Sequence, residues 1–473
     1  MADQLTGQTV ELLQALIRNA CVNDGHANSG HEFRSADTLE TFLEGTGLTI
    51  ERFEPTPGRV SLVCRIEGTD PNAPSLCLMG HTDVVPVNPD GWTRDPFGGE
   101  LLTSPHGVDE VWGRGAVDML NLTASMAVAF RHLARSTFRP SGNLIFFAVA
   151  DEESGSAHGA RWMADHHPDA IRADYVLTEN GGLHSGAEGS GRTGGNHGPG
   201  NHGPGNHGPG NHTVSVTVGE KGVAWRKLRI RGIPGHGSMP FRKDNALVQA
   251  AAVIQRISDY NPPARFHEFW RERVDTMGLS PEQAAVMLDP VKLDETLRAM
   301  PDAGTASYLY SCVHTTFSCN VLDTGKEAKT NVIPDNVELN VDIRTLPGET
   351  PAEVEAHLRA ALGDLADKVD VEIIMNDMSS MSRLDTPLWE SLQKAVNHPF
   401  GSARLSPTLS VGFTDARVFR DLGSVAYGAG LMSPDLDSGE FSRRFHGNDE
   451  RVDIESLRLS TQLWIDTATD LLG

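Results

Sequence analysis

Residues 143–156 read NLIFFAVADEESGS, a continuous apolar run that ends in adjacent acidic residues. A short run of this kind is typical of a strand buried on both faces of a parallel sheet. Further strand-like runs at 59–66, 75–80 and 173–180 alternate along the chain with a helical pattern at 122–134. Alternating strands and helices predict an α/β fold, in which a mixed, largely parallel sheet is flanked by helices.

The chain as a whole divides into a discontinuous domain and an inserted one. Its 473 residues exceed what one hydrophobic core usually organises, so we expect two domains. An α+β block at 219–378 is predicted to interrupt a catalytic domain made from 1–218 and 379–473. Within the first part, 181–212 contains the unit NHGPG three times in succession. We expect a flexible surface insertion there, because Gly and Pro in every unit disfavour a packed element.

Composition narrows the possible partners and location. The 40 Lys and Arg against 63 Asp and Glu give a net charge of −23, which argues against nucleic acid and anionic membranes as main partners. The sequence offers no apolar run long enough to span a bilayer, and its N-terminus does not resemble a secretory signal. Five scattered cysteines without a CxxC pair are typical of reduced thiols. We therefore expect a cytoplasmic enzyme.

Side chains of the types that bind metals stand in five short stretches. These are His81 and Asp83 in GHTDVVPV, Asp118 in WGRGAVDM, Glu152 and Glu153 in ADEESGS, Glu179 in LTEN, and His446 in FHGNDERV. Singly, each stretch is more often an ordinary solvated group. Together they indicate a metal centre, because apolar strands lead into three of them and repulsion among carboxylates gathered at sheet ends needs cations to offset it. Two imidazoles and three carboxylates are enough for two divalent ions, which we expect to be zinc, with cobalt or manganese as alternatives.

Local geometry suggests a division of labour among the acidic residues. Asp83 stands two residues after His81, so on a strand it points to the same side and can hold the second ring nitrogen of that histidine. Glu152 and Glu153 are adjacent and point in opposite directions on an extended chain. This arrangement suits one metal ligand and one general base.

The ordered motifs GHTDVVPV, WGRGAVDM, DEESGS, GIPGHGSMP, NVIPDNVELNVDIR and HGNDERV resemble one family of hydrolases. It is the family of dinuclear zinc enzymes that includes aminoacylase, glutamate carboxypeptidase, acetylornithine deacetylase and succinyl-diaminopimelate desuccinylase. The resemblance covers nearly the whole chain except 181–212. DPFGGE followed by VWGRGAVDM is most similar to carboxypeptidase S and the N-acyl-amino-acid hydrolases. The resemblance implies that the inserted block is a lid that also pairs two copies of the chain into a homodimer.

The resemblance also implies a role for each site residue. It implies His81 and Glu179 as ligands of one metal, Glu153 and His446 as ligands of the other, Asp118 as the bridging ligand, Glu152 as the general base, and Asp83 as the residue that orients His81. His236 would stabilise the oxyanion, often across a dimer interface. Asn331 and Arg344 would hold a free carboxylate of the substrate. Gly412 and Thr414, in GFTDAR, resemble a loop beside the substrate.

The activity implied by the resemblance is hydrolysis of an amide bond next to a free carboxylate, in a dipeptide, a C-terminal residue or an N-acyl amino acid. One alternative is a biosynthetic deacylase of the acetylornithine or succinyl-diaminopimelate type. Another is a non-catalytic binding protein stabilised by metal. The repeat histidines, His197, His202, His207 and His212, could hold a transition metal loosely, but a solvated repeat without such a role is favoured.

Overall fold

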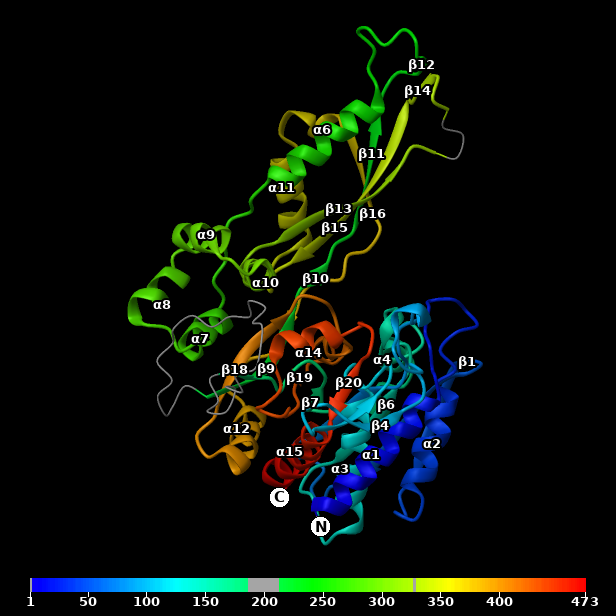
Figure 1. The fold of residues 1–473 in the computed structure, drawn as a ribbon, viewed down its shortest axis with the longest axis vertical. Helices are drawn as coiled ribbons and strands as arrows, with labels where there is room; N and C mark the ends of the chain where they lie inside the picture. Colours follow the sequence, from blue (N-terminus) through cyan, green and yellow to red (C-terminus); the bar gives the residue numbers. More distant parts are fainter. Residues whose placement is uncertain (1, 186–211, 326–328) are drawn as a thin grey trace.

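The computed structural model describes residues 2–185, 212–325 and 329–473, and these form two lobes (Figure 1). The strands are β1 (Ile50–Thr56), β2 (Arg59–Ile66), β3 (Leu76–His81), β4 (Glu100–Thr103), β5 (Asp109–Trp112), β6 (Leu144–Val149), β7 (Tyr175–Thr178), β8 (His184–Ser185), β9 (Thr213–Glu220), β10 (Gly222–Val223), β11 (Arg226–Arg231), β12 (Gly235–His236), β13 (Thr316–Asp323), β14 (Val332–Ile333), β15 (Asn336–Thr345), β16 (Val369–Ile373), β17 (Ser380–Met381), β18 (Arg404–Ser410), β19 (Val425–Gly428) and β20 (Arg451–Asp453). The α-helices are α1 (Ala2–Arg18), α2 (Phe33–Leu43), α3 (Leu120–Arg135), α4 (Ala160–His166), α5 (Pro168–Ile171), α6 (Ala246–Asp259), α7 (Glu268–Thr276), α8 (Pro281–Met287), α9 (Pro290–Ala299), α10 (Ala303–Val313), α11 (Pro351–Leu362), α12 (Pro387–Phe400), α13 (Ala416–Asp421), α14 (Ser438–Arg444) and α15 (Ile454–Leu472).

The large sheet of the lower lobe is mixed and is parallel in its middle. Its strand order is β1-β2-β6-β3-β7-β19-β9-β17, with β8 and β18 also paired to β9. Strands β6, β3, β7 and β19 run parallel to one another, whereas β1, β2 and β17 join by antiparallel ladders. Every residue of β3 and β6 is buried, as their continuous apolar sequences predict. The α/β fold class is confirmed.

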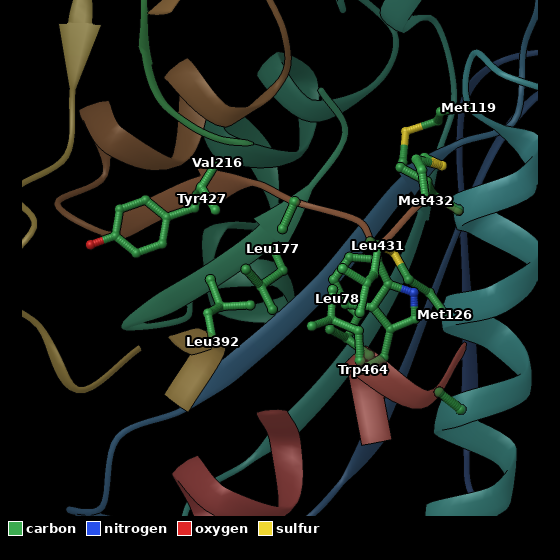
Figure 2. Close-up of a cluster of buried hydrophobic side chains, with 14 of the residues drawn as sticks. Leu78, Met119, Met126, Leu177, Val216, Leu392, Tyr427, Leu431, Met432 and Trp464 are labelled. Atoms are coloured by element: carbon green, nitrogen blue, oxygen red, sulfur yellow. The ribbon is translucent and has the colours of Figure 1, made fainter. Parts of the chain in front are cut away.

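A hydrophobic core fills the space between this sheet and the helices packed on one of its faces, among them α3, α12 and α15. Figure 2 shows Leu78 of β3, Leu177 of β7 and Tyr427 of β19 on the sheet side of this core, with Trp464 of α15 and Met126 of α3 on the helix side. Trp464 is fully buried and its indole N–H donates to Ser125 at 2.8 Å, so the polar end of this large side chain is satisfied. These helices cover one face of the sheet. The carboxyl ends of its parallel strands lie at its edge, where functional residues are usually found in such sheets.

The second sheet lies in the upper lobe and has its own core (Figure 1). Its order is β10-β15-β11-β16, with β13 also paired to β15. Helices α6 and α11 cover one face, where Val253 and Leu358 pack with strand residues such as Leu339. Strand β15 alternates buried and half-buried positions, which is the pattern of a strand with one covered face. This sheet is the α+β unit that the sequence predicts within 219–378.

Helices α7 to α10 belong to the same inserted stretch of sequence but pack elsewhere. Trp270 of α7 is fully buried in the core of the lower lobe, and the Oγ1 atom of Thr276 lies 2.6 Å from the Oγ atom of Ser406 in β18. The hydroxyl of Tyr308 in α10 donates to the carbonyl of Leu409 at 3.3 Å. The division into 1–218, 219–378 and 379–473 stays a prediction, since packing follows that division for the second sheet but not for these helices.

Two further expectations concern the membrane and the repeat. No helix within the described ranges combines the length and the apolar character needed to cross a bilayer. The NHGPG units and His197, His202 and His207 fall outside the described residues. His212 falls within them and its ring stacks on His184, with centroids 4.9 Å apart.

Candidate metal centre

Three parallel strands deliver polar side chains to one edge of the large sheet. His81 is the last residue of β3 and pairs in register with Val149, the last residue of β6. Glu152 begins a 3₁₀ turn directly after β6, and Glu179 follows the end of β7. Because the carboxyl ends of neighbouring parallel strands meet at one edge, these three side chains come together there.

A small three-stranded sheet brings two further members of the cluster. Strand β20 pairs with β5, so that Arg451 lies opposite Trp112. Asp118 follows β5 and His446 precedes β20, and their side chains meet, with Oδ2 of Asp118 2.9 Å from Nε2 of His446. The other carboxylate oxygen of Asp118 lies 3.2 Å from Nε2 of His81. Asp118 therefore stands between the two imidazoles.

Each imidazole faces a second carboxylate as well. Oε2 of Glu179 lies 3.9 Å from Nε2 of His81, and Oε2 of Glu153 lies 3.4 Å from Nε2 of His446. The structure thus brings together two groups of one histidine and one glutamate, with Asp118 shared between them. This is the pairing implied by the family resemblance, although the roles of these residues as ligands stay predictions.

Burial and mutual repulsion shift the acidities of these groups. Burial, reinforced by the charge of Glu179, raises the pKa of Glu152 well above its ordinary value. Burial also raises the pKa of Glu179, and the charge of Asp118 adds to the effect. Burial by itself would raise the pKa of Asp118, but hydrogen bonds from His446 and His81 hold it below its ordinary value. Hydrogen bonds to its carboxylate partners, led by Asp118, raise the pKa of His446 to about 10.

The donor set fits divalent cations. Oε1 of Glu153 is buried and has no hydrogen-bond partner among the described residues, which is unusual for a carboxylate oxygen unless something else binds it. One ligand atom from each of His81, Asp118 and Glu153 lies within 4.8 Å of the others, and the same holds for His81, Glu152 and Glu179. Imidazole nitrogen and carboxylate oxygen are donors that zinc, cobalt and manganese accept.

Asp83 supports the cluster differently from the sequence-based expectation. The ring Nδ1 of His81 lies 2.9 Å from the backbone carbonyl of Asp83, whereas the nearest oxygen of the Asp83 carboxylate is 3.6 Å away. The carboxylate instead accepts the backbone N–H groups of Glu152, at 3.3 Å, and Glu153, at 3.1 Å. Strand β3 ends at His81, and beyond its end the carbonyl of Asp83 rather than the side chain lies nearest to the ring.

Two supporting residues lie inside motifs quoted from the sequence but were not among the predicted site residues. Glu450 is buried, its carboxylate accepts the backbone N–H of Asp118 at 3.1 Å, and it pairs with Arg114 at 2.6 Å. The buried Asp415 accepts a short hydrogen bond from Ser156, which follows the Glu152 turn. Glu450 and Asp415 both lie inside quoted motifs, HGNDERV and GFTDAR, so their positions could have marked them.

A second supporting group comes from the N-terminal region. The side chain of Asn23 bonds to the carboxylates of Asp83 and Asp151, and Arg59 pairs with Asp151 and with Glu32 at 2.7 Å. These residues are all buried. No local pattern in the sequence distinguishes them from ordinary polar residues, because their partners lie far away along the chain.

The three predicted substrate contacts of the upper lobe do not lie together. His236 in β12 pairs with Val332 in β14, and the carbonyl of Asn331 accepts the N–H of Gly237 at 2.8 Å, so His236 and Asn331 share the far end of the lobe (Figure 1). Arg344 lies near the opposite end of β15, where it pairs with Val223 of β10. Within one chain, Asn331 and Arg344 are therefore separated by the length of a strand.

The loop that contains Gly412 and Thr414 lies near the connection between the lobes. Gly412 is exposed, and Thr414 is buried. The backbone N–H of Thr414 donates to the carboxylate of Glu220, at the end of β9, at 2.5 Å. Its hydroxyl accepts the N–H of Ala416. The polar groups of Thr414 are thus engaged within the chain, and a substrate-binding role for either residue stays a prediction.

A largely parallel α/β sheet at whose edge two imidazoles and several buried carboxylates gather is the framework of a metallohydrolase. The sequence model described as Peptidase family M20/M25/M40 matches residues 77–470, and the chain belongs to this family.

Curated relatives of known name share about a quarter of their residues with this chain. It is 25% identical to the N-fatty-acyl-amino acid synthase/hydrolase PM20D1 of Xenopus tropicalis, across 98% of this chain and 86% of the relative. It is 24% identical to the probable carboxypeptidase S-like 2 of Dictyostelium discoideum, across 84% and 72%. A succinyl-diaminopimelate desuccinylase of Cereibacter sphaeroides is 25% identical across 89% of both chains. The resemblance to this group of hydrolases is confirmed.

Solved structures support the fold. The M20 family metallo-carboxypeptidase Sso-CP2 from Sulfolobus solfataricus superposes with a TM-score of 0.70, at 16% identity, over 98% of this chain and 99% of that chain. At this identity the likeness concerns the fold alone.

Proposed function

We propose that this protein is a dinuclear, zinc-dependent amidohydrolase that cleaves an amide bond next to a free carboxylate. Its substrates would be dipeptides, C-terminal residues of short peptides or N-acyl amino acids. The observation that carries the proposal is the position of Asp118, whose two carboxylate oxygens face His81 at 3.2 Å and His446 at 2.9 Å. A carboxylate with one oxygen toward each imidazole is what a bridging ligand requires.

His81 and Glu179 would hold one ion and Glu153 and His446 the other, with Asp118 common to both. Bound divalent ions supply Lewis acidity toward an amide carbonyl and make water more acidic at neutral pH. The unpartnered Oε1 of Glu153 supports a ligand role for that residue. The cytoplasmic location expected from the composition stays a prediction beside this assignment.

Glu152 would act as the general base and later as the proton donor to the leaving nitrogen. It is buried beside Glu179 and His81, and burial raises its pKa well above the ordinary value. A carboxyl group of raised pKa accepts and returns a proton near neutral pH more effectively than an ordinary carboxylate. The Asp83 carboxylate holds the backbone N–H of Glu152 and so fixes the turn that carries this base.

His236 would stabilise the oxyanion from a second copy of the chain. The backbone N–H of Ser238 donates to Nδ1 of His236 at 3.2 Å, so Nε2 is the ring nitrogen that carries a proton and can donate to a substrate. His236 is exposed at the far end of the upper lobe from β10, which supports a contact made across a homodimer (Figure 1). Sedimentation of the purified protein tests this, because a monomer at working concentration contradicts action across a dimer.

Arg344 would bind the free carboxylate of the substrate, with Asn331 supplied by the partner copy. The guanidinium of Arg344 is held by Asp342 through Nε at 2.8 Å, while its Nη1 atom is buried without a hydrogen-bond partner among the described residues. A guanidinium held on one edge keeps its other edge available for a carboxylate. The separation of Asn331 from Arg344 within one chain fits a site completed by two copies.

The decisive experiment is hydrolysis by the zinc-loaded protein of dipeptides and N-acyl amino acids, each paired with its C-terminal amide and followed by chromatography. We expect cleavage of the free acids and not of the amides. Cleavage of both forms would keep the hydrolase and contradict the carboxylate clamp. No cleavage at full metal occupancy would contradict the enzyme and leave a metal-stabilised binding protein.

A second candidate is a biosynthetic deacylase. It is favoured by the desuccinylase relative, which matches 89% of this chain. Succinyl-diaminopimelate and acetylornithine therefore belong in the same panel. This candidate would be favoured if the kcat/KM for either compound exceeded the kcat/KM of every dipeptide and N-acyl amino acid by about tenfold.

A further inference from the structure

The N-terminal segment runs directly beside the centre, although it precedes the residues that the family model matches, 77–470. Val22 and Val84 form a parallel bridge. The N–H of Asn23 donates to the carbonyl of Val84 at 2.9 Å, and the N–H of Val84 donates to the carbonyl of Cys21 at 3.0 Å. These backbone bonds place the side chain of Asn23 next to Asp83.

The side-chain amide of Asn23 is buried, and both its nitrogen and its oxygen form hydrogen bonds. Nδ2 donates to Oδ2 of Asp83 at 2.8 Å and to Oδ1 of Asp151 at 3.0 Å. Oδ1 accepts the hydroxyl of Ser154 at 2.8 Å and the N–H of Gly25 at 3.2 Å. Carboxylates only accept hydrogen bonds, so the end of the amide that faces Asp83 and Asp151 must be the nitrogen.

These partners control the turn that carries Glu152 and Glu153. The Asp83 carboxylate accepts the backbone N–H of both residues, and Ser154 is the last residue of the same 3₁₀ turn. Asn23 therefore holds the turn at two points, through Asp83 and through Ser154. An amide is the fitting group at this place, because its two N–H bonds separate two buried carboxylates that would otherwise repel each other.

We propose that Asn23 is a positioning residue for the hydrolysis, which sets the placement of Glu152 through Asp83 and Ser154. This inference rests on the proposed function, in which Glu152 is the general base. Small displacements of a reacting group lower kcat strongly, whereas ground-state binding of the substrate is made elsewhere in the site. The variant Asn23→Ala should lower kcat about tenfold to a hundredfold, with KM changed by less than about twofold.

The isosteric variant Asn23→Asp separates positioning from packing. It keeps the volume of the side chain but sets a third carboxylate against Asp83 and Asp151. If Asn23 only filled space, Asn23→Asp would retain more activity than Asn23→Ala. We expect Asn23→Asp to lose at least as much kcat as Asn23→Ala does, because repulsion among the three carboxylates displaces the turn that carries Glu152.

Asn19→Ala is the matched control. Asn19 lies on the same segment, and its amide donates to Ser35 at 3.3 Å and Thr38 at 3.0 Å, away from the centre. Asn19→Ala removes two side-chain hydrogen bonds, whereas Asn23→Ala removes the four described above, so the melting temperature of Asn19→Ala should fall by less while its kcat stays unchanged. Equal losses of kcat in the two variants would overturn the proposal.

Ser154→Ala keeps the inference testable if Asn23→Ala does not fold. Ser154 is exposed, so its truncation leaves the core intact, and it removes one of the two links from Asn23 to the turn. We expect a fall in kcat of a few fold for Ser154→Ala, and a kcat equal to that of wild type would overturn the link. Where Asn23→Ala folds, the double variant Asn23→Ala/Ser154→Ala should lose no more kcat than Asn23→Ala alone, and losses that multiply would contradict the link. Wild-type protein is assayed first. If wild type cleaves no amide, the proposed function is refuted. If wild type is active and the Asn23 variants turn over substrate normally, only this inference is refuted.

Discussion

Oδ2 of Asp118 lies 2.9 Å from Nε2 of His446, which joins the first and last parts of the chain at one point of the centre. The contact depends on the small sheet in which β20 pairs with β5. His446 is half exposed, and it is the only imidazole in the group that it forms with Glu153 and Asp118. Under the proposed assignment of ligands, the first and last parts of the chain are therefore needed together for one complete set of donors.

His446→Ala should reduce bound metal from about two ions to about one ion per chain, because it removes the only nitrogen donor of one group. Metal analysis of dialysed protein measures this. His398→Ala, at an exposed histidine that pairs with Asp466, is the control and should keep both ions. Unchanged metal content in His446→Ala would exclude the residue as a ligand.

Glu152→Ala should lower kcat by about a thousandfold or more while metal content stays near that of wild type. The reason is that Glu152 is assigned to proton transfer and not to coordination. Oε atoms of Glu152 are nevertheless close enough to His81 and Glu179 to bind an ion. Loss of metal in this variant would therefore reassign Glu152 from base to ligand.

Arg344→Ala should raise KM for free-acid substrates about tenfold to a hundredfold with a smaller change in kcat, since a charge-assisted hydrogen bond contributes about 1.5–3 kcal/mol to binding. The amides of the same substrates should not respond. Arg229→Ala serves as the control, because Arg229 lies on β11 of the same sheet and forms ion pairs with Glu338 and Glu372 at its surface. Equal effects on acids and amides would contradict a carboxylate clamp.

Lys221 predicts a pH dependence of stability. Burial lowers its pKa to about 7, against 10.5 for an exposed lysine, while Nζ donates to the carbonyls of Ser311 and His314. Between these two pH values the unfolded chain binds the proton and the folded chain does not. The free energy of unfolding should therefore rise with pH above 7, by up to about 1.4 kcal/mol per pH unit relative to Lys221→Met.

Urea unfolding of both proteins at pH 7, 8 and 9 measures the difference in slope. Other titrating groups are common to the two proteins and cancel in the comparison. Parallel slopes would mean that Lys221 keeps its proton in the folded chain.

The sequence predicted the cluster at the sheet edge because its cause is local. Apolar strands end at His81, before Glu152 and before Glu179, and parallel strands must present their carboxyl ends together. The contributions of Asn23 and Glu450 could not be predicted in this way, since each depends on a contact with a residue distant in the sequence.

The helices of 281–313 show a different reason for an incomplete prediction. Their starting points carry clear sequence marks, Ser280 with Gln283 in a capping box and Asp289 before Pro290. Attention to these caps would have placed α8 and α9. Their packing against α7 and α10 could not follow from these caps, because caps specify where a helix begins and not which surface it meets.

The packing of α7 and α10 on the lower lobe has a consequence for chimeras in which one lobe is taken from another member of the family. The chain passes between the lobes at four links, Glu220–Gly222, Asp259–Glu268, Val313–Thr316 and Ile373–Ser380, where a simple insertion would have two. A chimera that replaces all of 219–378 would remove α7, together with Trp270, and uncover the apolar surface of the lower lobe on which that helix packs. A graft joined at all four links would leave that surface covered, and any rotation of one lobe against the other must bend the same four links at once.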